Sequence, residues 1–298
     1  MAFEGLRRFT RSLMGALRRE RSQGRRGPRN ENREGRVLCV ASGKGGTGKT
    51  VMVVNLATAM ARKGKKVLIL DADLGLANAH LLLGMTPRYN LSHVLNEKTS
   101  LEEIIEPGPE GISLISGGSG ISQLAALDEY HLFRLIRQVA ALEGNHDLII
   151  IDTSAGIAPQ TMVFLYAARE ILLVTTPDIT AMTDAYAMVK TLLQRSADTR
   201  IALVANRVRS QEEADGVHEK LDRVSRRFLR QPISFWGSVP FDRCIPRSIH
   251  MKEPVLRSFP RSEASRAIDR IVRRMLAERP GPQDRKVLDR TLQDALSR

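Results

Sequence analysis

The sequence predicts an α/β fold with a doubly wound, mostly parallel sheet and helices on both of its faces. Three observations predict this fold. Short apolar runs alternate with helical patterns along most of the 298 residues. These runs are continuously apolar, which is typical of strands that are covered on both faces. Hydrophobic residues make up 42% of the chain, which is enough to build a core of that kind.

The expected elements follow one another in a regular order. Val37–Ala41 predicts the first strand, residues 50–63 have a helical pattern, and Val67–Leu70 predicts the second strand. The later strands are expected at 112–115, 148–151, 171–175, 201–205 and 233–239. The later helices are expected at 129–142, 157–168, 180–195, 211–230 and 262–277. Because a helix separates most successive strands, neighbouring strands are expected to run parallel.

The loop after the first strand carries the strongest functional signal. Residues 43–50 read Gly-Lys-Gly-Gly-Thr-Gly-Lys-Thr and satisfy the phosphate-loop pattern G-x-x-x-x-G-K-[ST] between a strand and a helix. Its glycines allow backbone N–H groups to close on phosphate oxygens, and the helix N-terminus adds partial positive charge. Lys49 would reach the β- and γ-phosphates, and Thr50 would ligate Mg²⁺. The expected nucleotide-binding residues here are Gly43, Lys44, Gly45, Gly46, Thr47, Gly48, Lys49, Thr50 and Val51.

Acidic residues follow two of the other expected strands. Leu148–Ile151 runs into Asp152, which is the Walker B pattern of a carboxylate that holds Mg²⁺. Val67–Leu70 runs into Asp71 and Asp73, and strand ends of this kind line the ligand crevice. A lone Asp in such a place can equally cap a helix or a turn. Together with the phosphate loop, these carboxylates favour a P-loop NTPase site for ATP or ADP with Mg²⁺, in which one of the second pair orients the attacking water.

Lys44 makes the phosphate loop similar to the deviant Walker A motif, KGGxGKT, of the division-site and plasmid-partition ATPases of the MinD/ParA family. Further stretches resemble one branch of that family, the flagellar-number regulators known as FlhG or FleN. These stretches are Asp71–Asn78, Leu82–Gly84, Asp152–Ile157, Thr183–Tyr186, Val239–Asp242 and Phe259–Ser262. The resemblance covers residues 37–277, and the stretches at 183–186 and 259–262 are the more specific to the flagellar branch.

The resemblance implies a role for each matching residue at the phosphates. Lys44 would cross a dimer interface to the partner's nucleotide, so that Lys44, Lys49 and Asp73 are the expected catalytic residues. Asp73 would lie in the first switch and position the water for hydrolysis. Thr50, Asp71 and Asp152 are the expected metal residues, with Asp71 supporting the metal indirectly. Asp152 and Gly156 would form the second switch.

The resemblance also implies where the base is bound. Asn206 would read the adenine, and Pro240 and Asp242 would belong to the loop that closes over it. The alternatives are purely structural roles, in which Asn206 caps a turn and Pro240 ends a strand. Two departures stand out: residues 1–36 lack the DQA-like element with which flagellar members activate a GTPase, and Thr175–Thr180 differs from the expected Glu-Pro-Thr-Ser pattern.

The function implied by the resemblance is a slow regulatory ATPase that forms a homodimer with ATP and controls the number or placement of flagella. The partners implied are a signal-recognition-type flagellar GTPase, although the missing element puts its activation in doubt, and a flagellar transcription regulator or switch component. The alternatives are a MinD-type division-site regulator, a ParA-type partition ATPase that binds DNA, and an interaction module that keeps ATP as a structural ligand.

The charge of the chain lies at its two ends. Of the net charge of +13, residues 1–36 contribute +7 and residues 243–298 another +7, whereas residues 37–242 are close to neutral. We therefore expect three parts: a basic N-terminal segment and linker (1–36), the ATPase domain (37–277), and a C-terminal linker with a short helix (278–298). Basic ends of this kind favour an anionic partner surface, either membrane or nucleic acid.

Residues 1–19 have the pattern of a basic amphipathic helix, which favours an anionic membrane over DNA as that partner. The alternative is that residues 1–19 form a solvated tail without a binding role. Residues 284–297 form a second, weaker candidate because three Asp residues dilute their charge. Two cysteines fit a reducing compartment. The expected location is cytoplasmic, with peripheral association at the inner membrane and at the cell pole.

Overall fold

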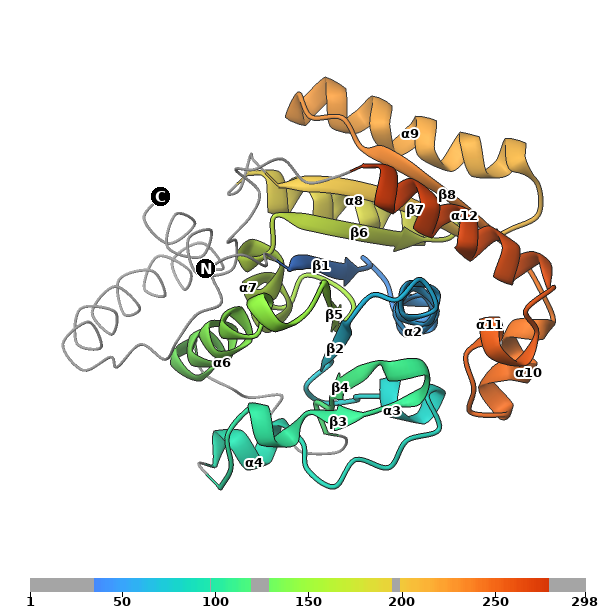
Figure 1. The fold of residues 1–298 in the computed structure, drawn as a ribbon. Helices are drawn as coiled ribbons and strands as arrows, with labels where there is room; N and C mark the ends of the chain where they lie inside the picture. Colours follow the sequence, from blue (N-terminus) through green and yellow to red (C-terminus); the bar gives the residue numbers. More distant parts are fainter. Residues whose placement is uncertain (1–34, 97, 119–128, 195–198, 279–298) are drawn as a thin grey trace.

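A computed structural model of the chain describes residues 35–96, 98–118, 129–194 and 199–278. The expected N-terminal helix at 1–19, most of the linker that follows it and the expected helix at 284–297 lie outside these residues. Figure 1 shows one layered body in which a central sheet is sandwiched between helices. No helix in the described ranges is long and apolar enough to cross a membrane.

The body is built on one sheet of eight strands in the order β3-β4-β2-β5-β1-β6-β7-β8. All neighbouring strands run parallel except β3, which pairs antiparallel with β4. The strands are β1 (Arg36–Ala41), β2 (Val67–Ala72), β3 (Glu106–Pro107), β4 (Ser113–Ile115), β5 (Leu148–Thr153), β6 (Glu170–Thr175), β7 (Arg200–Val208) and β8 (Ser234–Pro240). The predicted α/β fold with a doubly wound, mostly parallel sheet is therefore confirmed.

Helices cover both faces of the sheet. One face carries α2 (Lys49–Ala61), α11 (Val255–Ser258) and α12 (Glu263–Ala277), and the other carries α6 (Glu129–Ala141), α7 (Pro159–Ala167), α8 (Ile179–Leu193) and α9 (Gln211–Leu229). Three shorter helices complete the described body. They are α3 (Ala79–Leu82), α4 (Leu91–Leu95) and α10 (Cys244–His250). Single 3-10 turns cover Glu102–Ile104, Pro109–Gly111 and Glu143–Asn145.

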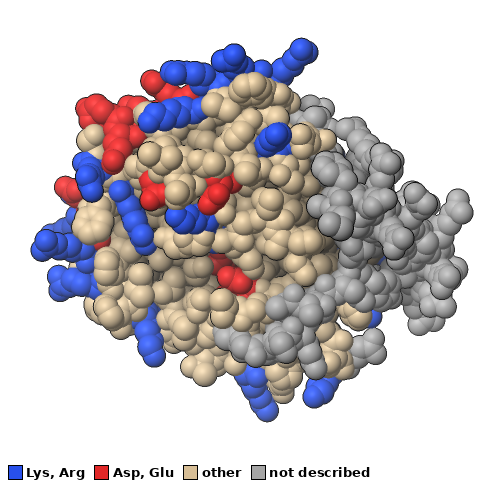
Figure 2. Space-filling view, turned by 180° about the vertical axis from the view of Figure 1, so that it is seen from behind, with Lys and Arg blue, Asp and Glu red and all other residues tan. Residues whose placement is uncertain are grey.

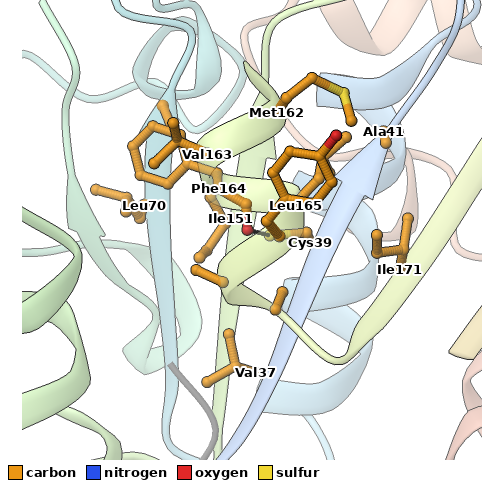
Figure 3. Packing of buried hydrophobic residues seen from close by; sticks show 14 of the residues in the cluster. Val37, Cys39, Ala41, Leu70, Ile151, Met162, Val163, Phe164, Leu165 and Ile171 are labelled. Atoms are coloured by element: carbon orange, nitrogen blue, oxygen red, sulfur yellow. Dashed lines mark hydrogen bonds between the residues drawn. The ribbon is translucent and has the colours of Figure 1, made fainter. Parts of the chain in front are cut away.

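Strand β1 shows why continuous apolar runs predict this architecture. Alternate side chains of β1 enter two separate cores, with Leu38 and Val40 packing under α2 and Cys39 packing under α7. In Figure 3, Cys39 lies beneath Phe164 and Leu165 of α7. Its thiol donates to the Phe164 carbonyl at 3.5 Å, and burial raises the pKa of that thiol. Each fully buried aliphatic side chain contributes about 1.5–3 kcal/mol, so both faces of the strand stabilise the fold.

The long elements and the short strand β4 lie where the sequence predicts them, whereas the short helices and β3 do not appear in the prediction. Helices α3, α4, α10 and α11 have four to seven residues each, which is too few for a helical period to be recognised. Because β1, β2, β5, β6 and β7 run parallel, their carboxyl ends lie along the same side of the sheet. We call this the carboxyl edge, and we call the opposite edge, where these strands begin, the amino edge.

Candidate functional site

The loop between β1 and α2 is shaped by two close contacts with later parts of the chain. A Cβ atom on Gly43 would lie 2.2 Å from the backbone of Asp184 in α8. Gly48 has a left-handed backbone with φ of 96°, and a Cβ atom there would lie 2.4 Å from the Asn206 amide nitrogen. Only glycine fits at both positions. The loop is therefore held between α8 and the end of β7 before any ligand binds.

The beginning of α2 is suited to hold an anion. Helix α2 starts at Lys49 without a side-chain cap, so the first N–H groups of the helix are left for another acceptor. The Lys49 side chain is buried, and its positive charge lowers the pKa of Asp152. The buried Thr47 hydroxyl has no partner among the described residues. A bound phosphate would satisfy these donors together.

Two carboxylates are buried side by side at the carboxyl edge. Asp71 and Asp152 are paired in register on β2 and β5, and both are almost fully buried. Asp71 accepts the N–H groups of Asp73 and Ala79 at 3.2 and 2.9 Å. Neither oxygen of Asp152 has a hydrogen-bond partner in the described part of the chain. Burial raises the pKa of both carboxyls, and the charge of Asp71 raises that of Asp152 further.

These carboxylates fit a divalent cation. A buried carboxylate without partners is costly unless a cation neutralises it. The Thr50 hydroxyl also lowers the pKa of Asp152, so it lies within reach of the same carboxylate. Because the described residues contain no group of three or more His, Cys, Asp or Glu side chains that could hold a metal, the rest of the coordination would come from water and phosphate oxygens. Mg²⁺ is commonly held in this way.

Asp73 is fixed by a residue that sequence reasoning did not identify. The Ser154 hydroxyl donates to Asp73 Oδ1 at 2.8 Å. Two residues further on, the Gly156 N–H donates to the Ser42 carbonyl at 2.9 Å. The expected first and second switches are therefore joined to each other and to the phosphate loop. Ser154 lies in the stretch Asp152–Ile157 that resembles the family, but the pattern gives it no role, because its contact with Asp73 joins segments that are far apart in the sequence.

Lys44 lies at the open rim of the site. Its ammonium group donates to the Thr180 hydroxyl, and it lies 3.8 Å from the Asp178 carboxylate. Asp178 also caps α8 by accepting the N–H groups of Thr180 and Ala181. The Lys44 side chain stays about half exposed. The segment that departs from the expected family pattern is thus the one that holds Lys44 within this chain.

The three residues expected at the base occupy different positions. Asn206 is buried and donates from Nδ2 to the Thr47 carbonyl at 2.7 Å, while its Oδ1 accepts the Arg207 N–H at 3.0 Å. Pro240 ends β8 beside it. Asp242 faces the fold instead, since its oxygens accept the N–H groups of Cys244 and Ala264 at 2.7 and 3.0 Å.

The surroundings of Asp242 are those of a helix cap. Burial alone would raise the pKa of Asp242, but the N–H donors outweigh it and lower that pKa. Both oxygens are engaged at the starts of α10 and α12. Asp242 can therefore shape the loop at the base site without touching the base. Adenine reading by Asn206 and contact of Pro240 and Asp242 with the base stay predictions.

The chain is similar to flagellar regulators. Residues 38–255 match the family described as the CobQ/CobB/MinD/ParA nucleotide binding domain. The antiactivator FleN of Pseudomonas aeruginosa is 36% identical over 239 residues, which cover 80% of this chain and 85% of FleN. The flagellum site-determining protein YlxH of Helicobacter pylori is 32% identical over 243 residues, which cover 79% of this chain and 80% of YlxH.

Solved structures of the same fold extend the comparison. The cell division ATPase MinD of Pyrococcus furiosus superimposes with a TM-score of 0.71 at 26% identity, covering 82% of this chain and 99% of MinD. The septum site-determining protein MinD of Pyrococcus horikoshii, complexed with Mg-ADP, gives a TM-score of 0.70 at 26% identity, with 82% and 97% covered. The chain therefore belongs to the MinD/ParA family of nucleotide-binding ATPases, in its FlhG/FleN flagellar-number branch.

Proposed function

We propose that this protein is an ATP-controlled switch that dimerises on ATP and regulates the number or placement of flagella at the membrane. The observation that carries the proposal is the joining of Asp73, Ser154 and the phosphate loop around two buried carboxylates. Similarity to the antiactivator FleN and to the flagellum site-determining protein YlxH supports the flagellar role. The Mg-ADP complex of the related MinD supports the choice of ligand.

The chain's own residues define what the site does with ATP. The N–H groups at the start of α2 and the Lys49 ammonium bind the phosphates. Thr50 and Asp152 hold Mg²⁺, which supplies neutralising charge to the phosphate oxygens when bound. Asp73 holds the attacking water, and the Ser154 hydroxyl fixes the direction of the Asp73 carboxylate. Slow turnover, as implied by the resemblance to switch ATPases, would let the ATP-bound state persist long enough to act as a signal.

The surface around Lys44 supports a dimer. Ile157 and Ile179 are 50% and 77% exposed. Both lie near Lys44, since Ile179 follows the Asp178 that contacts Lys44 and Ile157 follows the Gly156 bonded to Ser42. Exposed apolar side chains around a nucleotide site favour contact with another protein surface. Exposed ion pairs such as Lys44–Asp178 contribute little to stability, because water competes for both charges, so Lys44 can leave this contact to reach a partner's phosphates.

The dimer proposal is tested by measuring mass and turnover with ATP and Mg²⁺. We expect Asp73→Ala to bind ATP, lose hydrolysis and remain dimeric, because the event that loosens the dimer is blocked. We expect Lys44→Ala to bind ATP and remain monomeric. Normal hydrolysis by Asp73→Ala would contradict the water-holding role, and normal dimerisation by Lys44→Ala would contradict the trans role.

The membrane part of the proposal depends on residues 1–19. Their pattern of basic and apolar residues is that of an interfacial helix. Co-sedimentation with vesicles that contain anionic lipid tests it, with the double variant Leu6→Glu and Leu13→Glu as the matched change. We expect the variant to lose most of its vesicle binding and the wild type to bind only anionic vesicles. Equal binding by both proteins would remove this segment from the account.

A division-site role is the second candidate, because septum site-determining MinD proteins also match the chain, one of them at 31% identity over 246 residues. Deletion of the gene separates the two roles. The flagellar proposal predicts a changed number or position of flagella with normal septa. Misplaced septa with normal flagella would favour the division role, and loss of DNA from daughter cells would favour the partition role.

A further inference from the structure

An exposed surface of mixed character lies on α10 and its flanking turns. Of the eight large hydrophobic side chains that are exposed in the described ranges, three fall within residues 241–251. Phe241, Ile249 and Met251 are 63%, 39% and 54% exposed. None of them lies in the phosphate loop or in the switches. We call these residues, with the cations described next, the α10 patch.

Cations accompany these apolar side chains. Arg243, Arg247 and Met251 recur every four residues, so they share one side of α10. His250 and Lys252 are also exposed. The two nearby acids are engaged elsewhere, since Asp242 caps two helices and Glu253 lies 3.8 Å from Arg257. Figure 2 shows Lys and Arg side chains along the left margin, the side on which α10 and α11 lie when Figure 1 is turned.

The end of α10 is strained at Lys252. This residue has a left-handed backbone with φ of 54°, at a helix end where the Glu253 N–H donates to the Ser248 carbonyl and the Lys252 N–H to that of Ile249. Glycine is the usual residue in such a turn. A glycine can therefore replace Lys252 without backbone strain, which makes Lys252→Gly a mild way to remove this cation.

We propose that the α10 patch binds the anionic lipid headgroups of a membrane, a contact that rests on the proposed membrane association and adds a site on the folded body to it. Cations beside exposed apolar side chains match the boundary between anionic headgroups and acyl chains. A second copy of this chain is disfavoured, because a two-fold contact would bring like charges together. Phosphate binding by nucleic acid would use the cations and leave Phe241, Ile249 and Met251 without a role.

The patch also lies next to the parts of the site that are expected to respond to nucleotide. Phe241 follows Pro240, whose strand partner on β7 is two residues from Asn206. A Cβ atom on Gly84, just beyond α3, would lie 3.0 Å from the Lys252 carbonyl oxygen. The start of α3 is held by Asp71, which accepts the Ala79 N–H. The patch therefore overlaps the expected base loop at Phe241 and extends at Lys252 toward the segment that follows the first switch.

The test is co-sedimentation of the full-length protein with vesicles of phosphatidylcholine containing 30% phosphatidylglycerol, and with phosphatidylcholine alone. Two double variants change the patch, Ile249→Ser with Met251→Ser and Arg243→Gln with Lys252→Gly. Because glycine suits the backbone of residue 252, the second variant removes a cation without disturbing the fold. The matched control is Arg227→Gln with Phe228→Ser on α9, where Phe228 is 64% exposed.

We expect Arg243→Gln with Lys252→Gly to bind anionic vesicles about tenfold or more weakly, since each cation contributes roughly fivefold near an anionic surface. Ile249→Ser with Met251→Ser should also bind clearly more weakly, because it removes the apolar side chains that would enter the interface, and the control should bind like the wild type. Wild-type binding by both patch variants, with loss of binding by Leu6→Glu and Leu13→Glu, would overturn this inference and leave the proposed function standing. No binding by the wild-type protein would overturn both. Patch variants that lose salt-sensitive DNA binding and keep vesicle binding would assign the patch to nucleic acid.

Discussion

The two edges of the sheet both contain buried charge, and they treat it in opposite ways. At the amino edge, Arg36 of β1 makes two hydrogen bonds of 2.6 Å to Glu170 of β6 and a third to the Met275 carbonyl of α12. At the carboxyl edge, Asp152 of β5 has no hydrogen-bond partner in the described part of the chain. One edge pairs its charges through short hydrogen bonds. At the other, Lys49 and Thr50 favour the Asp152 carboxylate, but its two oxygens stay available to a bound cation.

This difference distinguishes residues that stabilise the fold from residues that are available to bind a ligand. Paired buried charges are costly to break but are satisfied within the chain. An unpaired buried carboxylate lowers the stability of the ligand-free chain, and such perturbed groups are typical of functional sites. Changes at the amino edge should therefore lower the free energy of unfolding and leave ATP turnover intact. Changes at the carboxyl edge should abolish turnover and leave the free energy of unfolding unchanged or raised.

The largest effect is expected at the carboxyl edge. Lys49→Met removes the cation that faces the phosphates, so we expect ATP turnover to fall by about a hundredfold or more. The free energy of unfolding should change little by comparison, since a flexible apolar chain replaces the lysine stem. Steady-state phosphate release and urea unfolding measure the two quantities. Turnover within a few fold of the wild type would contradict the assignment.

At the amino edge, Glu170→Ala should act on stability. It leaves the Arg36 guanidinium buried without its carboxylate, and the loss of one partner of a buried pair costs about 3–5 kcal/mol. Urea unfolding at constant pH measures this loss. Turnover per folded molecule should stay unchanged, and a selective loss of turnover in a stable variant would show that the two edges are not separate.

Asp152→Asn should change how the free energy of unfolding depends on pH, because it removes a buried ionisable carboxyl. Burial and the charge of Asp71 raise the pKa of Asp152 to about 8, whereas the unfolded chain has the ordinary value of 3.8. Between these values the folded chain binds a proton that the unfolded chain has released. The free energy of unfolding of the wild type therefore falls as the pH rises through this window.

The asparagine variant cannot ionise, so it should escape that fall and exceed the wild type in stability at pH 8 by about 1–3 kcal/mol. Unfolding in urea with EDTA at pH 5 and at pH 8 measures the difference between the two proteins. A difference that is the same at both pH values would show that the Asp152 carboxyl is not strained by burial. The variant should also lose Mg²⁺-dependent turnover.

The smallest effect is expected at Ser154. Ser154→Ala removes the hydrogen bond that directs the Asp73 carboxylate, so kcat should fall by about three- to tenfold, in line with one hydrogen bond to a charged group. KM should stay unchanged, because the Ser154 hydroxyl is bonded to Asp73 rather than to the phosphate loop, and Ser154→Thr should restore kcat. A change in KM alone would mean that Ser154 acts on binding rather than on the water.

Sequence patterns predict the parts of this molecule that depend on neighbours along the chain. The long strands and helices have periodic patterns, and the phosphate loop, Asp71, Asp73 and Asp152 each follow directly from a strand end. Helices of four to seven residues have no such period. The Ser154–Asp73 bond joins residues 81 positions apart, and the contact of Lys44 with Thr180 spans 136 positions. Contacts of this kind depend on strand order, which local patterns do not specify.

Asp242 is a case in which the sequence pattern suggests a ligand contact that the fold does not require. Its place after β8 and its resemblance to the base loop predict a ligand contact, but the folded chain directs its carboxylate toward two helix N-termini. Only the folded structure, which brings the start of α12 to Asp242, shows this, because the Ala264 N–H that it accepts lies 22 residues away. A carboxylate near a site can thus serve the shape of the site rather than its chemistry.

The central claim, that Lys44 acts on the nucleotide of a partner, is tested most directly by mixing two inactive variants. In a mixed dimer of Lys44→Ala and Asp73→Ala, one site has its own Asp73 and receives Lys44 from the partner. The claim predicts that the two variants, combined before ATP is added, regain turnover that neither shows alone, because each mixed dimer has one competent site. A mixture that stays as inactive as its two components would contradict it.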